Sequence, residues 1–220
     1  MKKRLKINTK DPNYLYFLLS LVLMLVLPPL APLSQQGLLL MNITYGLMLG
    51  MGVIYAGTSR RDFILLGAMA TIIYVLFLYE QQDVYFSVIS AILTLFYFTL
   101  LLVKIIRYIL FNPIGVNEIY ACITGYLILG VTGAPLFYIT EQVFENALQL
   151  PAQAQFYDFI YFSFITLTSV GYGDISPIHP FAKAISVLIS VMGQLYLTIL
   201  IAIIIGKFLA GDKEASDFEE

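Results

Sequence analysis

Residues 169–174 read Ser-Val-Gly-Tyr-Gly-Asp, a run in which glycine stands at alternate positions. Because glycine adopts positive φ at little cost, this alternation lets successive backbone carbonyls point to one side of the chain. Rings of backbone carbonyls, together with a hydroxyl, can replace the water around a potassium ion without any titrating charge. The run therefore predicts a ladder of ion-binding oxygens from Ser169, Val170, Gly171, Tyr172 and Gly173.

The apolar stretch at 156–169 leads into this run and has only about two thirds of the length of a membrane span. We expect it to re-enter the membrane rather than cross it, with the non-helical backbone buried in protein or lining an aqueous cavity. Asp158 suits a helix amino terminus, and neither Gly nor Pro interrupts the chain up to Thr168. The sequence predicts a short re-entrant helix whose negative carboxyl end favours a cation.

Long uncharged stretches make up most of the remaining chain. Of the 220 residues, 60% are apolar and 12% are charged, whereas soluble domains carry about a quarter of charged residues. A membrane core of roughly 30 Å needs about 20 apolar helical residues. The fold class predicted is an all-α membrane protein with six transmembrane helices and a re-entrant pore helix and filter between helices five and six. The predicted spans are 14–33, 37–57, 63–79, 84–103, 119–140 and 184–206.

Basic residues indicate the orientation of these spans. Eleven of the twelve Lys and Arg residues fall before span one or after spans two, four and six, and Lys183 is the exception. By the positive-inside rule, both termini are expected in the cytoplasm. The basic start followed by an apolar run also resembles a cleaved signal peptide. Cleavage would leave the orientation of the later spans unchanged.

The sequence FNPIGVN, at 111–117, divides the chain. Its Pro and Gly break a helix, and Asn117 is a plausible cap for the fifth span. We predict a basic cytoplasmic amino terminus at 1–13, a four-helix membrane domain at 14–111, a pore domain at 112–210 and an acidic cytoplasmic tail at 211–220. Because one chain supplies only one strand of the carbonyl ladder, several copies must surround an ion, which predicts a symmetric oligomer.

The segment TLTSVGYGD, at 166–174, resembles the signature of the potassium-channel family, whose version ends in TVGYGD. The resemblance covers 117–209 as outer helix, pore helix, filter and inner helix, and is of the prokaryotic type. It implies a homotetramer around one pore in the plasma (inner) membrane. The implied partners are copies of the chain, membrane lipids and K⁺, with no nucleic acid and no cofactor beyond the permeant ion.

The resemblance also assigns roles around the filter. It places K⁺ at Ser169, Val170, Gly171 and Tyr172, with carbonyls inward and the Tyr172 ring outward. It places Asp174 at the outer mouth, where its carboxylate would brace the filter and raise the local cation concentration. The expected filter supports are Tyr161, Phe162, Thr168 and Asp174, of which Tyr161 and Phe162 stand where many members carry Trp.

Two positions depart from the family pattern. Ser169 stands where Thr is usual, so it keeps the hydroxyl but loses the methyl group that fixes the rotamer. Ile165 stands where some members have Glu, so Asp174 has no second carboxylate behind the filter. We expect filter inactivation to differ accordingly, and prolonged currents from native and Ile165→Glu channels would test this.

The sixth span predicts a cavity and a gate. Ser186, Ser190, Gln194 and Thr198 recur every fourth residue, so they share a helix face that either meets water or contacts another helix. For Gln194 we favour the cavity. Gly193 is either a hinge, as in the family, or a packing site. The resemblance makes the side chains of Ile201 and Ile205 a gate that closes by dewetting.

The fourth span lacks the repeated Arg and Lys of voltage-gated relatives. Lys104 and Arg107 stand at its cytoplasmic end and read as snorkelling anchors. Spans two and three contain no acidic partners. We therefore predict weak or absent voltage sensitivity, and the first four helices are either a degenerate sensor or a scaffold.

Other functions fit the sequence less well. A non-selective cation channel is disfavoured by the Gly-Tyr-Gly resemblance, and an ion-coupled transporter generally needs ionisable groups that the spans lack. An enzyme is not expected, since no catalytic set or phosphate-binding loop stands in the connections. The net charge of −2 argues against a nucleic-acid binder, and the single cysteine, Cys122, is expected to be a buried thiol. His179 reads as a loop residue or, alternatively, as a proton sensor.

Overall fold

A computed structural model describes residues 13–30, 35–56, 59–79, 84–113 and 115–216. Several predicted features lie partly or wholly outside these residues. They are the basic amino terminus, the end of the first predicted span at 31–33, the connections at 34–37 and 80–83, and the last four residues of the acidic tail.

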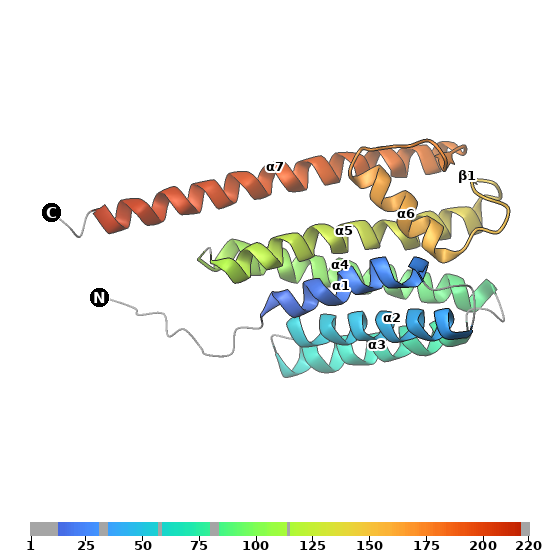
Figure 1. The fold of residues 1–220 in the computed structure, drawn as a ribbon, viewed down its shortest axis with the longest axis horizontal. Helices are drawn as coiled ribbons and strands as arrows, with labels where there is room; N and C mark the ends of the chain where they lie inside the picture. Colours follow the sequence, from blue (N-terminus) through green and yellow to red (C-terminus); the bar gives the residue numbers. More distant parts are fainter. Residues whose placement is uncertain (1–12, 31–34, 57–58, 80–83, 114, 217–220) are drawn as a thin grey trace.

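The described chain is almost entirely helical (Figure 1). Its elements are α1 (Tyr14–Leu30), α2 (Gln35–Ala56), α3 (Arg60–Tyr79), α4 (Val84–Phe111), α5 (Val116–Val143), β1 (Leu148–Gln149), α6 (Phe156–Leu167), β2 (Ser176–Pro177) and α7 (Pro180–Ser216). The predicted all-α membrane class is confirmed. Among the described residues, five helices are long and apolar enough to cross a membrane, namely α2, α3, α4, α5 and α7.

The first predicted span is helical over the 17 residues of α1, which is shorter than those five helices. Pro28 and Pro29 lie in its last turn. Other helix boundaries also differ from the predicted ones, because the helices continue beyond their apolar stretches. The helix predicted to end at residue 103 continues to Phe111, and α7 begins at Pro180 and continues to Ser216.

Helix α5 lies at the centre of the fold. It contacts α1, α4, α6 and α7, whereas α2 and α3 pack against each other and against α1 and α4 (Figure 1). Of its most apolar 18-residue window, 67% is buried, compared with 17% for α3 and 11% for α7. Cys122, in α5, is buried as predicted. Helix α5 therefore joins α1 to α4, the four-helix part, to α6 and α7, with which it forms the predicted pore part.

The predicted cap of the fifth span is wrong. Gly115 is the N-cap of α5, and its backbone N–H donates to the Glu118 carboxylate at 2.9 Å. Asn117 instead accepts a hydrogen bond from the backbone N–H of Tyr14 at 2.8 Å. It therefore caps α1, a helix more than a hundred residues earlier, because the first turn of any helix leaves N–H donors unpaired.

Lys104, predicted as a snorkelling anchor, also forms an ion pair. Its Nζ lies 2.7 Å from Asp62 Oδ2 in the first turn of α3, and both side chains are partly exposed. The ion pair thus ties the end of α4 to the start of α3. Spacing within one helix could not reveal this contact, since it joins two helices.

Candidate functional site

The short helix α6 stands beside the second half of α5 and is held there by close backbone contact (Figure 1). Its amino terminus is capped as the sequence predicts, with Asp158 Oδ2 accepting from the Gln155 N–H at 2.7 Å. The buried Ser163 hydroxyl donates to the Gly130 carbonyl of α5 at 2.6 Å. A Cβ at Gly133 would collide with Ser163 Oγ, so glycine permits this approach. With 12 residues, α6 is about 18 Å long, too short to cross a membrane.

The end of α6 fixes the start of the predicted filter. The Ile165 carbonyl accepts from the N–H groups of Val170, at 3.0 Å, and Gly171, at 3.2 Å. The Ser169 N–H donates to the Thr166 carbonyl at 3.0 Å, and the Thr168 hydroxyl donates to the Phe164 carbonyl at 2.7 Å. Carbonyls left free by the end of a helix are satisfied in this way.

Positive φ alternates along the filter run. Ser169 has φ 58°, Gly171 has φ 54° and Gly173 has φ 82°. The glycine spacing predicted the last two, but it gave no sign that Ser169 would adopt the left-handed conformation that few non-glycine residues take. All five residues from 169 to 173 are exposed on the single chain. None of these side chains carries a charge, which suits recognition by neutral oxygens.

The two predicted aromatic supports behave differently. The Tyr161 hydroxyl donates to Asp174 Oδ2 at 2.7 Å, so it connects α6 to the residue that follows the filter. This hydrogen bond is the main reason that the pKa of Asp174 lies below its ordinary value. Phe162 is buried and packs against Phe137 of α5, with ring centroids 4.5 Å apart. Tyr161 therefore contacts the filter segment, and Phe162 anchors α6 to α5.

Helix α7 packs on the inner side of this turn. The Ser190 hydroxyl donates to the Thr166 carbonyl at 2.9 Å, which makes Ser190 a helix contact. A Cβ at Gly193 would collide with the Leu167 carbonyl, and α7 runs unbroken through this position. The lack of a side chain at Gly193 is thus used for packing, and bending there stays a prediction. Gln194 Nε2 donates to Ser169 Oγ at 3.3 Å.

The other two polar residues predicted to share this face of α7 bond within their own helix. The hydroxyls of Ser186 and Thr198 donate to carbonyls one turn earlier, at 2.9 and 2.8 Å. Further along, Ile201 and Ile205 are 56% and 53% exposed on the single chain. Their role as a gate stays a prediction.

The connections around the filter form a small ordered unit that the sequence did not predict. Strands β1 and β2 pair antiparallel, with Leu148 opposite Pro177 and Gln149 opposite Ser176. The segment before α6 is thereby joined to the segment after the filter. His179 accepts from the Phe181 N–H through Nδ1 at 3.2 Å and stacks on Phe144. Strands of two residues leave no periodic pattern, so sequence reasoning missed them.

One further contact links α6 to the four-helix part. The Tyr157 hydroxyl donates to the Leu25 carbonyl of α1 at 3.0 Å. Pro29 has no N–H to give this carbonyl, which lies four residues earlier in the helix. The sequence signal for this contact is the pair Pro28 and Pro29, since each proline inside a helix leaves one carbonyl without its helical N–H donor.

Among the described residues, no group of three or more His, Cys, Asp or Glu side chains is placed to hold a metal ion.

Comparison with protein families bears on the same part of the chain. Residues 122–210 match the family model described as an ion channel. The matched segment contains most of α5, all of α6, the filter run and most of α7. No curated protein and no solved structure matches the chain. The match supports ion conduction by the pore part and leaves the permeant ion to be argued from the site.

Proposed function

We propose that this protein is the subunit of a homotetrameric, potassium-selective channel that conducts K⁺ passively across a membrane. The observation that carries the proposal is the run at 169–173, an uncharged and exposed backbone with alternating positive φ at the end of α6. This run lies within the segment that matches the ion-channel model. Potassium is favoured because Gly-Tyr-Gly resembles the family filter.

The exposure of the filter and of α7 supports a tetramer. Val170 is 52% exposed and Tyr172 is 75% exposed on the single chain. The most apolar window of α7 has a mean hydropathy of 2.4, yet only 11% of it is buried. A helix of this kind needs lipid or other protein around it. Four copies would place α7 around an axis, where the oxygens of residues 169–172 complete the shell of a dehydrated ion.

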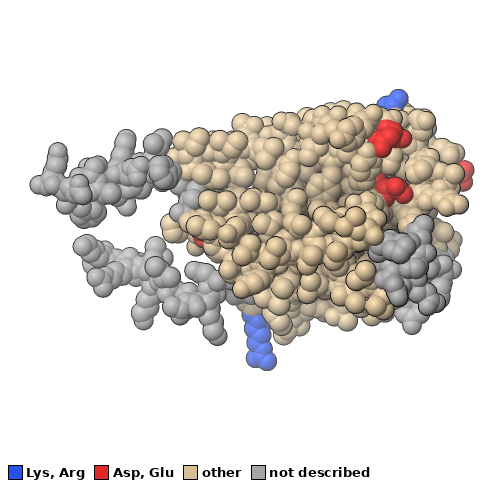
Figure 2. Space-filling view, in the orientation of Figure 1, with Lys and Arg blue, Asp and Glu red and all other residues tan. Residues whose placement is uncertain are grey.

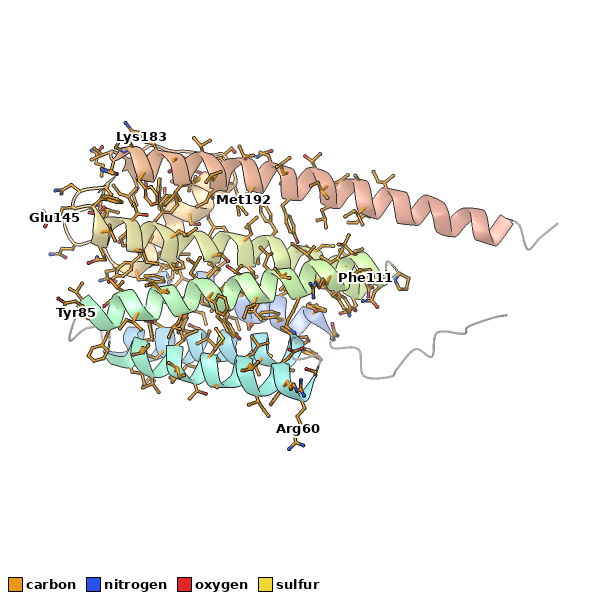
Figure 3. All side chains as sticks on the ribbon, turned by 180° about the vertical axis from the view of Figure 1, so that it is seen from behind. Arg60, Tyr85, Phe111, Glu145, Lys183 and Met192 are labelled. Carbon is orange, nitrogen blue, oxygen red and sulfur yellow. The ribbon has the colours of Figure 1, made fainter. Side chains whose placement is uncertain are left out.

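The distribution of charge supports an orientation with both termini in the cytoplasm. Arg60 lies at the end of the molecule opposite Glu145 and Lys183 (Figure 3). Figure 2 shows most of its acidic side chains, together with one basic side chain, near one end, and a further basic side chain beyond a broad uncharged surface. In this orientation α6 re-enters from the outer side and its carboxyl end points toward the pore. Asp174 then stands at the outer mouth.

Conduction follows from these placements. A potassium ion that reaches the filter exchanges water for carbonyl oxygens, and the hydroxyl of Ser169 completes the innermost site. Gln194 lies next to that site, and the side chains of Ile201 and Ile205 close the cytoplasmic entrance when they exclude water. Weak voltage dependence is expected, since each charge moved across 100 mV supplies about 2.3 kcal/mol and α4 carries its two cations near one end.

The proposal is tested with purified protein in lipid vesicles. Native mass should give four subunits, and rubidium uptake down a gradient should be blocked by barium. Under opposed potassium and sodium gradients, the reversal potential should lie near that of potassium. A strictly monomeric protein, or equal permeability to sodium and potassium, would refute the proposal. A conductance that rises steeply over tens of millivolts would refute only the expectation for voltage.

A further inference from the structure

Ser169 adopts a left-handed backbone conformation, and its side chain lacks the methyl group that would fix its rotamer. Its φ of 58° is fixed by the hydrogen bond from its N–H to the Thr166 carbonyl. That bond leaves the side chain unrestrained. Threonine would limit χ1 through its methyl group, whereas serine can populate all three staggered rotamers. A hydroxyl that serves as an ion ligand therefore needs a second restraint at this position.

The structure offers such a restraint from α7. Gln194 Nε2 donates to Ser169 Oγ at 3.3 Å. The backbone that carries Gln194 is itself held against α6. Ser190 bonds to the Thr166 carbonyl, and Gly193 touches the Leu167 carbonyl. The amide thus approaches the hydroxyl from a helix that is fixed against the same turn of α6 that sets the Ser169 backbone.

We propose that Gln194 is a positioning residue that orients the Ser169 hydroxyl toward the innermost ion site and so replaces the missing methyl group of threonine. This inference rests on the proposed function. A hydroxyl oxygen has two lone pairs. When one accepts from the Gln194 amide, the other is left to face the ion, and the O–H group turns away from it. Gln194 itself need not touch the ion.

Barium applied from the cytoplasmic side is a suitable probe of this site. It is a doubly charged ion of nearly the size of potassium, and from that side it meets the Ser169 oxygens first. The principal variant is Gln194→Leu, which keeps the bulk of the side chain and removes the amide. We expect the concentration for half block of rubidium uptake to rise about two- to tenfold, the factor that the net energy of one hydrogen bond implies.

The decisive measurement is a double-mutant cycle with Ser169→Thr. In the Ser169→Thr background the methyl group fixes the rotamer, so Gln194→Leu should change barium block by less than about twofold. Equal weakening in both backgrounds would overturn the inference, because it would mean that Gln194 acts on the cavity in general. An unchanged block in Gln194→Leu alone would also overturn it.

Two further variants complete the test. Gln142→Leu makes the same chemical change at an exposed position in the last turn of α5 and should leave block unchanged. If Gln194→Leu channels do not assemble, Gln194→Asn is used instead, because it shortens the side chain. It should also raise the barium concentration for half block, and only in channels that keep Ser169. Barium-sensitive rubidium uptake by the unmodified protein separates the two proposals. Without such uptake the potassium-channel function fails, whereas uptake with no coupling between the two residues refutes only the role of Gln194.

Discussion

The surroundings of the predicted filter, within α5 to α7, and the four-helix part, α1 to α4, differ in how their helices are joined. Around the filter, the short side chains of Ser163 and Ser190 reach carbonyls of a neighbouring helix. Between α2 and α4 the contacts are made by long side chains. Tyr97 donates to the Leu49 carbonyl, and Tyr45 bonds to Thr94.

A serine can reach a neighbouring carbonyl only where the two backbones approach closely, and the glycines near the filter permit that approach. A tyrosine side chain can bridge a wider distance between two helix backbones, and its hydroxyl end can shift position. The predicted filter is therefore held by short side chains and by a close backbone approach at Gly193, which leave little room for adjustment, whereas the four-helix part is joined by long side chains that can adjust.

The largest effect is expected for Gly193→Ala. The new Cβ would meet the Leu167 carbonyl, a backbone atom that cannot rotate away. Overpacking of this kind typically costs about 1–3 kcal/mol, and in the proposed tetramer the cost would arise in all four subunits. We expect loss of stable tetramers and of rubidium uptake, measured by native gel after heating and by vesicle flux.

Two glycines of the four-helix part serve as controls. At Gly52 the Cβ would meet the hydroxyl end of Tyr97, so Gly52→Ala should be milder. At Gly50 no atom lies within 4 Å, so Gly50→Ala should be neutral or slightly stabilising. Equal loss of tetramer in Gly193→Ala and Gly52→Ala would contradict the contrast between rigid and adjustable contacts.

The next effect concerns the hydrogen bond that joins the two parts. Tyr157→Phe removes the donor to the Leu25 carbonyl, which Pro29 cannot replace. An unsatisfied carbonyl of this kind costs about 1–3 kcal/mol. We expect a lower midpoint of thermal unfolding in detergent.

The matched background for that test is Pro29→Ala. It restores a backbone N–H for the same carbonyl, so Tyr157→Phe should then cost less than half as much. If the cost is unchanged, the tyrosine acts through packing rather than through the carbonyl.

A smaller effect is expected for the ion pair of Lys104 and Asp62. Both side chains are partly exposed, at 24% and 31%, so solvent screens the attraction. Asp62→Asn should lower the free energy of unfolding by less than about 1 kcal/mol. It should also leave the slope of conductance against voltage unchanged. A large change in that slope would mean that Lys104 moves in the membrane field and would contradict the anchoring role.

Sequence reasoning reached the elements but not the contacts between them. Apolar length gave the helices, and Asp158 gave the start of α6, because these signals lie within one element. Glycine spacing gave positive φ at Gly171 and Gly173. The sequence could not predict that Asn117 caps α1 or that Lys104 meets Asp62, because such pairs depend on how the helices pack. The different contacts of Tyr161 and Phe162 could not be predicted for the same reason: Tyr161 meets Asp174, and Phe162 meets α5.

The smallest effect is expected for pH, and it concerns Asp174, which we propose to lie at the outer mouth of the pore. The hydrogen bond from Tyr161 holds the pKa of Asp174 below its ordinary value. A lowered pKa means that this contact contributes fully above the ordinary aspartate pKa of about 3.9 and is lost as pH falls through the lowered value. Asp174 should therefore stay ionised from pH 8 to pH 5, and its protonation should not change rubidium uptake over that range.

The variant Tyr161→Phe tests that expectation. Without the hydroxyl donor, the pKa of Asp174 should rise toward its ordinary value. The loss of uptake should then begin at a higher pH than in the unmodified protein. The measurement is uptake over an external pH series from 8 down to 4. His179→Gln is measured in parallel as a control for the one imidazole in the chain. A loss of uptake centred between pH 5 and pH 7 that survives His179→Gln would show that Asp174 is not held ionised by Tyr161. The rigid support of the predicted filter would then be limited to the contacts at the carboxyl end of α6 and would not include Asp174.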